Sequence, residues 1–160
     1  MIGAVSGLAS PAQAAPAPAV NDTTAATDIR AQALNGFRIH SVWASSCLDS
    51  NNGGEPRLTH CDTSNPRQRW WSDANGPLWS YYDHYCLDGN GGDDVYLLPC
   101  NGNEWQKWSI RNPGVSTTWL HFVHVKTGKC LDTNGTAIYK VDCDRTGRNA
   151  HQMWQKLHRN

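Results

Sequence analysis

Short runs of apolar, β-branched and aromatic residues alternate along the chain with clusters of glycine, asparagine and aspartate. The first clear run covers residues 37–43, and an Asn- and Gly-rich segment follows at 50–54. Runs of this length predict β-strands, and Asn and Gly predict tight turns because both accept a positive φ. No segment shows a sustained helical period, so the pattern predicts an all-β protein.

The same order of motifs occurs three times, about every 40 residues. Each copy has Cys-Leu-Asp, a second cysteine and Gln-x-Trp, with about four short strands per copy. The predicted strands include 37–43, 57–61, 68–71, 78–82, 95–100, 106–110, 119–125 and 137–143. One copy cannot bury its own apolar face, but three around an axis can share a core. The pattern therefore predicts a threefold domain of about twelve strands, with repeats at about 36–75, 76–113 and 114–160.

All six cysteines belong to these copies, and the two within each copy are 14, 14 and 13 residues apart. Because the spacing repeats, we expect one disulfide within each repeat: Cys47–Cys61, Cys86–Cys100 and Cys130–Cys143. A disulfide that closes a loop of this size stabilises a domain by about 3 kcal/mol. Leucine and tryptophan recur at equivalent positions and are predicted to form the shared core: Leu48, Leu87, Leu131, Trp70, Trp108 and Trp154.

The residues before position 36 lack this pattern. Residues 1–14 are small and mostly apolar and end in Ala-Gln-Ala, which fits a signal-peptidase site, so they predict a signal peptide or its remnant. Residues 15–35 predict a flexible leader rich in Ala, Thr and Pro, and the folded domain is expected at 36–160. The even cysteine count agrees with secretion. No run approaches the roughly 20 apolar residues that cross a bilayer, so no membrane insertion is expected.

The formal net charge is 0, which argues against nucleic acid or an anionic membrane as a partner. The chain has only two glutamates, Glu55 and Glu104, in non-equivalent places, and no nucleophile elbow or phosphate-binding glycine loop. We therefore expect no enzyme activity and no cofactor. The acidic segment 88–94 lacks EF-hand spacing, so a solvated turn is favoured over a calcium loop. His121 and His124 are expected on opposite strand faces, and no metal site is predicted.

The triplicate pattern resembles the ricin-type (R-type) lectin β-trefoil, including the xylan- and galactose-binding modules of actinobacterial glycoside hydrolases. The resemblance covers Gly36 to about Leu157 and implies twelve strands with one potential sugar pocket per repeat. In that family the Gln and Trp of Gln-x-Trp bond backbone and fill the core. The matching residues here are Gln68, Trp70, Gln106, Trp108, Gln152 and Trp154.

The resemblance also implies which residues would bind sugar. The family's aspartate, which accepts hydrogen bonds from sugar hydroxyls, is matched by Asp49, Asp88 and Asp132. The family's stacking aromatic, two residues before the second cysteine, is replaced by Thr59, Leu98 and Val141. The glutamine four before that cysteine is replaced by Arg57, Tyr96 and Tyr139. The asparagine before Gln-x-Trp is replaced by Arg67, Trp105 and His151. No repeat retains the full set.

Tyr96 and Tyr139 share a strand face with the lost aromatic position, since residues i and i+2 point the same way. Either could reach a sugar ring shifted along the strand. Repeats two and three, with Asp88 and Asp132, are therefore the better predicted sites, whereas Asp49 belongs to a degenerate one. The alternative for each aspartate is that its carboxylate only holds the following turn. The tyrosines are equally consistent with packing against the next repeat.

The sequence thus predicts a secreted, non-catalytic protein that binds a polysaccharide or galactose-type glycans at shallow sites in repeats two and three. The alternative is a scaffold that has lost sugar binding and acts through a protein partner, as an inhibitor, a toxin-associated subunit or a surface interaction module. A third possibility is the binding module of an enzyme standing alone. No oligomeric state is predicted.

Overall fold

The computed structural model describes residues 36–158, and within them it contains twelve strands and three short 3-10 helices. Repeat one contains β1 (Phe37–Ser41), β2 (Ser46–Asp49), β3 (Arg57–Thr59), η1 (Pro66–Gln68) and β4 (Trp70–Ser72). Repeat two contains β5 (Leu78–Ser80), β6 (Tyr85–Gly89), β7 (Val95–Pro99), η2 (Glu104–Gln106) and β8 (Trp108–Arg111). Repeat three contains β9 (His121–His124), β10 (Cys130–Thr133), β11 (Ile138–Val141), η3 (Ala150–Gln152) and β12 (Trp154–His158). The predicted signal peptide and leader lie outside the described residues.

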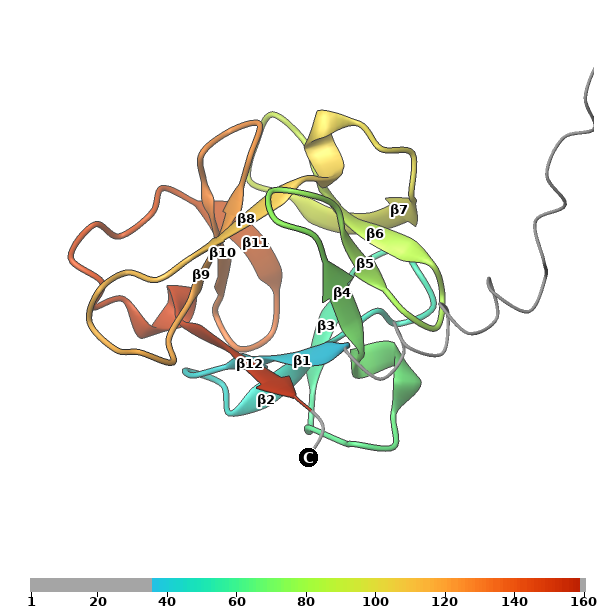
Figure 1. Ribbon diagram of the computed structural model, residues 1–160, viewed down its shortest axis with the longest axis horizontal. Helices are drawn as coiled ribbons and strands as arrows, with labels where there is room; N and C mark the ends of the chain where they lie inside the picture. The colour runs from blue at the N-terminus through green and yellow to red at the C-terminus, as the bar shows by residue number, and fades with distance from the viewer. Residues whose placement is uncertain (1–35, 159–160) are drawn as a thin grey trace, which may run out of the picture.

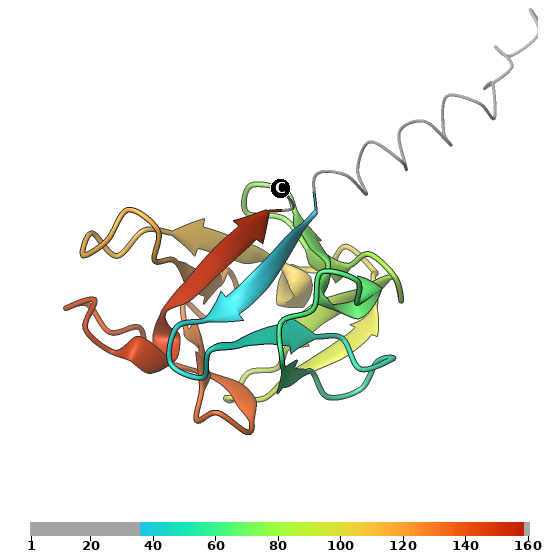
Figure 2. The same cartoon turned by 90° about the horizontal axis from the view of Figure 1, so that it is seen from below.

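The three repeats surround a common centre and form three lobes (Figure 1). Each lobe carries one antiparallel hairpin, β2–β3, β6–β7 or β10–β11. Strand β1 pairs with β12 from Phe37 opposite His158 to Ser41 opposite Trp154, so the first and last strands lie side by side (Figure 2). The predicted all-β trefoil is confirmed.

The three predicted disulfides are also confirmed, with Cα–Cα distances of 4.9, 5.0 and 4.9 Å. The predicted leucines and tryptophans are fully buried in one core cluster. Each tryptophan donates its indole N–H to the carbonyl of the leucine in its own repeat: Trp70 to Leu48 at 2.8 Å, Trp108 to Leu87 at 2.8 Å and Trp154 to Leu131 at 3.0 Å. The recurring residues therefore supply both the apolar core and its polar anchors.

The structure corrects the predicted ends of two strands and the predicted local structure of Gln-x-Trp. The strand predicted over 37–43 ends at Ser41, and the one predicted over 78–82 ends at Ser80, because the backbone turns immediately afterwards. The glutamine of each Gln-x-Trp lies in a 3-10 helix instead of a strand. In each repeat its Oε1 accepts a backbone N–H and its Nε2 donates to a backbone carbonyl, which ties the helix to the end of the hairpin.

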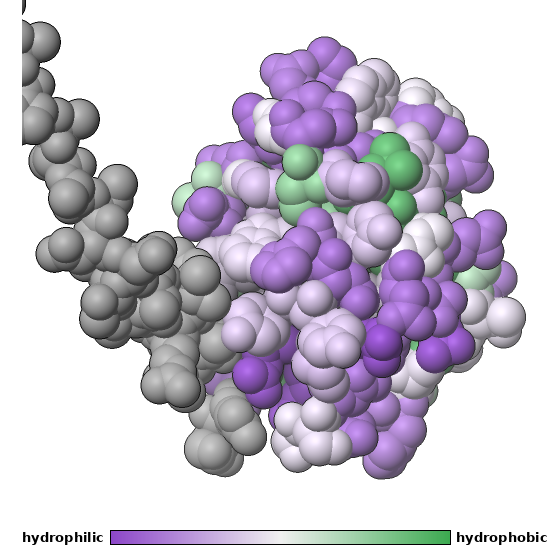
Figure 3. All heavy atoms as spheres, turned by 90° about the vertical axis from the view of Figure 1, so that its right-hand side faces the viewer, coloured by the Kyte–Doolittle hydropathy of each residue, from purple (hydrophilic) through white to green (hydrophobic). Residues whose placement is uncertain are grey.

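The surface is mostly polar. The face on the right-hand side of Figure 1 is hydrophilic except for one small hydrophobic patch (Figure 3). Large apolar side chains that are well exposed are few: Trp43, Tyr82, Leu98, Val115 and Val125. No helix among residues 36–158 is long and apolar enough to cross a membrane.

Candidate functional site

The hairpin of each repeat places the aspartate of Cys-Leu-Asp directly opposite the residue that lies four before the second cysteine. The facing pairs are Asp49 with Arg57, Asp88 with Tyr96 and Asp132 with Tyr139. Directly opposed residues of an antiparallel pair put their side chains on the same face. Each hairpin therefore presents one carboxylate and one long side chain together.

In repeat one the carboxylate of Asp49 is occupied by the protein itself. Its Oδ1 accepts the backbone N–H of Asn51 at 2.8 Å, and its Oδ2 accepts Nδ2 of Asn65 at 2.8 Å. The turn that follows has Asn51 and Asn52 at φ of 47° and 59°, a conformation that asparagine tolerates. Asp49 thus links the hairpin turn to the residue that caps η1.

Repeats two and three lack these bonds. Among the described residues, neither Asp88 nor Asp132 accepts a backbone or asparagine N–H as Asp49 does, although both are buried. Each instead faces a tyrosine whose hydroxyl interacts with one part of the carboxylate. Burial raises the pKa of Tyr96 and of Tyr139, and the facing carboxylate raises it further. These two hairpins therefore keep carboxylate oxygens that a bound hydroxyl could use.

The three positions of the missing asparagine contact side chains from the next repeat. The guanidinium of Arg67 lies 4.9 Å from the ring centroid of Tyr82, and the ammonium of Lys126 lies 5.8 Å from that of Trp105. The ring of His151 lies 4.2 Å from that of Trp43, centroid to centroid, with the planes tilted by 31°. The chain thus forms one cation–π or ring–ring contact at each boundary between repeats.

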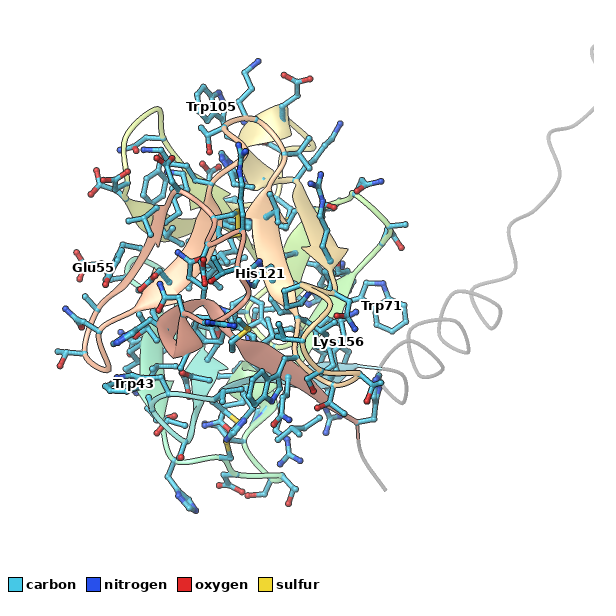
Figure 4. All side chains as sticks on the ribbon, turned by 90° about the vertical axis from the view of Figure 1, so that its left-hand side faces the viewer. Trp43, Glu55, Trp71, Trp105, His121 and Lys156 are labelled. Atoms are coloured by element: carbon cyan, nitrogen blue, oxygen red, sulfur yellow. A yellow bond between two sulfur atoms is a disulfide. The ribbon has the colours of Figure 1, made fainter. Side chains whose placement is uncertain are left out.

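Sequence reasoning did not assign a role to Trp43, Tyr82 or Lys126. A signal was present, because each lies four residues before the first cysteine of its repeat. The contacts of these residues cross the boundaries between repeats, and no motif within one repeat indicates which residue of its neighbour it meets. Figure 4 shows Trp43 at one edge of the molecule and the half-buried Trp71 at the opposite edge, so these two tryptophans do not share one surface.

Two lysines of repeat three bind the acidic segment 88–94. The ammonium of Lys140, a fully buried residue, donates to the carbonyls of Gly92 and Asp94 at 2.6 and 3.0 Å. Lys129 donates to the carboxylate of Asp93 at 2.5 Å. Since Lys140 occupies the carbonyls that a calcium ion would need, the geometry favours the turn over a calcium loop.

One further group has the composition of a metal site. The side chain of His121 lies near the sulfurs of Cys130 and Cys143, but those cysteines form a disulfide and offer no thiolate. Nε2 of His121 is buried without a hydrogen-bond partner in the described part of the chain. Burial lowers the pKa of His121, so the neutral imidazole is favoured. His121 is therefore a packing residue beside the disulfide.

A hollow of about 580 Å³ lies where the three hairpins meet. The tip of the first hairpin forms a bridge with β7, and the tip of the second with β11. The hollow is lined by residues of all three hairpins, including Arg57, Tyr96 and Tyr139. The tyrosines of the two candidate sites therefore border one shared depression.

Twelve strands in three disulfide-stapled repeats, each with an aspartate-bearing hairpin, define a β-trefoil domain of the lectin type. A family model described as ricin-type beta-trefoil lectin domain matches residues 24–108 and again 74–160, and the chain belongs to this family. Membership implies carbohydrate binding.

The chain is similar to N-acetylgalactosaminyltransferase 7. The human protein is 29% identical over 116 residues, which cover 68% of this chain and 16% of the transferase. The mouse protein is 26% identical over 140 residues, covering 84% and 20%. The chain thus spans a fifth or less of the length of these relatives.

Solved structures agree on the fold. The hemolytic lectin CEL-III matches with a TM-score of 0.68 and 23% identity, covering 79% of this chain and 31% of that one. GalNAc-T7 with UDP, GalNAc and Mn²⁺ matches with a TM-score of 0.62 and 25% identity, covering 78% and 23%. The designed threefold-symmetric protein ThreeFoil matches with a TM-score of 0.64 and 15% identity, covering 76% and 97%.

Proposed function

We propose that the protein is a secreted, non-catalytic lectin that binds a glycan or polysaccharide through repeats two and three. The observation that carries this proposal is the difference among the three aspartates. Asp49 is saturated by Asn51 and Asn65, whereas Asp88 and Asp132 face tyrosines and lack those bonds. A sugar hydroxyl that donates to a buried carboxylate forms a charge-assisted hydrogen bond, which is stronger than a neutral one.

Two further features support the choice of ligand. Tyr96 and Tyr139 border the same hollow of about 580 Å³, which suits an oligosaccharide better than one sugar unit. The similar transferase structure was determined with GalNAc, and the lectin SeviL, of the same fold, with the asialo-GM1 saccharide. Galactose-type glycans and plant, fungal or bacterial polysaccharides are therefore the first ligands to test.

Secretion is part of the proposal, and the three disulfides support it because such bonds persist in oxidising compartments. The non-catalytic role is supported by the matched family, which is a lectin domain. Since the chain spans only part of the transferases, we extend the proposal to a binding module of the kind that accompanies glycoside hydrolases or transferases.

A glycan array, with pull-down on insoluble xylan, chitin and cellulose, tests the proposal. Binding should weaken about tenfold or more in Asp88→Ala and in Asp132→Ala, and should change little in Asp49→Ala. If no glycan or polysaccharide is bound, the lectin function is wrong and a protein partner becomes the better explanation. Equal losses in all three variants would contradict the ranking of the repeats.

A further inference from the structure

The exposed indole of Trp43 belongs to repeat one in sequence but lies beside repeat three in space. Its side chain is 54% exposed, the highest value among the large apolar residues noted above. Its ring contacts His151 of η3, and its Nε1 lies 4.0 Å from the point that a methyl group on Gly135 would occupy. Gly135 belongs to the turn between β10 and β11, so Trp43 stands over the hairpin that carries Asp132 and Tyr139.

The turn that carries Trp43 is held in place before any ligand arrives. The backbone N–H of Val42 donates to the carbonyl of Met153 at 3.0 Å, which attaches the turn to repeat three. Within the turn, Ala44 N–H donates to Oγ of Ser41 at 3.1 Å and Ser45 N–H to the carbonyl of Ser41 at 3.0 Å. A fixed aromatic ring binds at a lower cost in conformational entropy than a mobile one.

His151 supplies a polar atom beside this ring. Its Nδ1 lies 2.7 Å from the carbonyl oxygen of Thr133, the residue after Asp132. A carbonyl only accepts, so Nδ1 carries the proton, and in the neutral ring Nε2 is an acceptor. No residue of the described chain hydrogen-bonds to Nε2 of His151. His151 also stands at the position where the resemblance places a sugar-binding asparagine.

We propose that Trp43 and His151 form the stacking subsite of the repeat-three glycan site. The apolar face of one pyranose ring packs against the face of the Trp43 indole that His151 leaves open, and other hydroxyls of the same oligosaccharide donate to Nε2 of His151 and to Asp132. The aromatic platform that Val141 cannot provide is thus supplied by the neighbouring repeat. This inference rests on the proposed lectin function and adds a residue that selects for ligands with a flat apolar ring face.

The other two boundaries explain why this one is singled out. Tyr82 is equally exposed, at 53%, but it is stacked on the guanidinium of Arg67 beside the saturated Asp49. At the boundary between repeats two and three the equivalent residue is Lys126, which is not aromatic and pairs with Glu104. Only at Trp43, among the three, does an exposed ring adjoin another aromatic ring in a repeat whose aspartate lacks the bonds that saturate Asp49.

The test compares Trp43→Ala with Tyr82→Ala, a matched control of equal exposure at the equivalent position. Using the tightest glycan from the array, titration calorimetry should show about tenfold weaker binding for Trp43→Ala and unchanged binding for Tyr82→Ala. Trp43→Phe, which keeps a ring, should recover most of the affinity. Because both side chains are exposed, neither substitution should change the melting temperature. An unchanged melting temperature then shows that the variant is folded.

A second measurement locates the ring. The chain has 8 tryptophans. Their indole N–H signals can be followed by NMR, and the signal that vanishes in Trp43→Phe should shift on glycan titration. Should Trp43→Ala bind as tightly as the parent while Asp132→Ala does not, the subsite is wrong and the lectin function stands. Loss of binding in Asp88→Ala alone would also overturn the Trp43–His151 subsite. If the parent protein binds no glycan, both the subsite and the lectin function are wrong.

Discussion

The first and third repeats share one scaffold and differ in what that scaffold presents. Both bury a leucine and a tryptophan joined by an indole-to-carbonyl hydrogen bond, and both carry a disulfide across the hairpin. In repeat one the aspartate is consumed by the turn and by η1, whereas in repeat three it faces Tyr139. The comparison teaches that the motif Cys-Leu-Asp reports the fold, and that the neighbours of the aspartate decide whether it is available for binding.

The largest expected effect concerns the shared scaffold. Trp70→Ala and Trp154→Ala should each lower the free energy of unfolding by about 3–5 kcal/mol, because each removes a fully buried ring and leaves a leucine carbonyl without its donor. Urea denaturation measures both. If the two losses differed by more than about 2 kcal/mol, the repeats would not be equivalent even as scaffold.

The next effect separates the aspartates by stability. Asp49→Ala should lower the free energy of unfolding by about 1–2 kcal/mol, since it leaves the N–H of Asn51 and Nδ2 of Asn65 without their acceptor. Asp132→Ala removes no such bond to a backbone or asparagine N–H and only the interaction with the Tyr139 hydroxyl, so its loss should be smaller, about 0.5 kcal/mol. A loss in Asp132→Ala as large as that in Asp49→Ala, measured by the same denaturation, would show that both carboxylates hold turns.

A smaller effect is expected at the turn before the first cysteine of each repeat. The equivalent residues are Ser45, His84 and Gly128, with φ of 50°, 55° and 73°. Gly128→Ala should lower the free energy of unfolding by about 1 kcal/mol through backbone strain alone, because an added methyl group meets no atom within 4 Å. Ser45→Gly should raise it by about 0.5 kcal/mol. The free energy of unfolding should therefore fall in Gly128→Ala and rise in Ser45→Gly. A fall in both variants would contradict the assignment of backbone strain to these positions.

The smallest effect depends on pH. His124 is fully buried in repeat three, where repeats one and two have Ser41 and Ser80. Burial lowers the pKa of His124 and of His121 below the ordinary value of 6.5, so the unfolded chain binds more protons than the folded one. Their contribution to stability is complete above pH 6.5 and is lost as the pH falls below it.

Melting temperatures between pH 7 and pH 5 should fall less in His124→Ser than in the parent. An identical decline in both would show that His124 does not set the acid sensitivity.

Most of the scaffold could be predicted because the same scaffold residues occur in each of the three repeats. The pairing of Cys130 with Cys143 and the burial of Trp154 follow from residues that recur at the same offsets. The facing of Asp132 and Tyr139 was not foreseen, because opposition across a hairpin depends on register, which the length of the turn sets. Sequence alone could place Tyr139 on a strand face but not opposite a particular carboxylate.

Contacts between repeats were beyond sequence reasoning. Trp43 was assigned to a strand, and its contact with His151 depends on how the first repeat docks against the third. Lys140 is fully buried on the same strand face as Ile138, because its ammonium reaches carbonyls 46 and 48 residues earlier. In both cases the contact depends on a partner that is distant in sequence.

The pairing of β1 with β12 also sets an order of assembly. The disulfides join cysteines only 13 or 14 residues apart, so each can close while the chain is still being synthesised. The side chains of His40 on β1 and Gln155 on β12, by contrast, are 115 residues apart. Until β12 is made, β1 presents an unpaired edge, and such edges invite pairing between molecules. We expect the growing chain, rather than the finished trefoil, to be the form that most needs protection from aggregation.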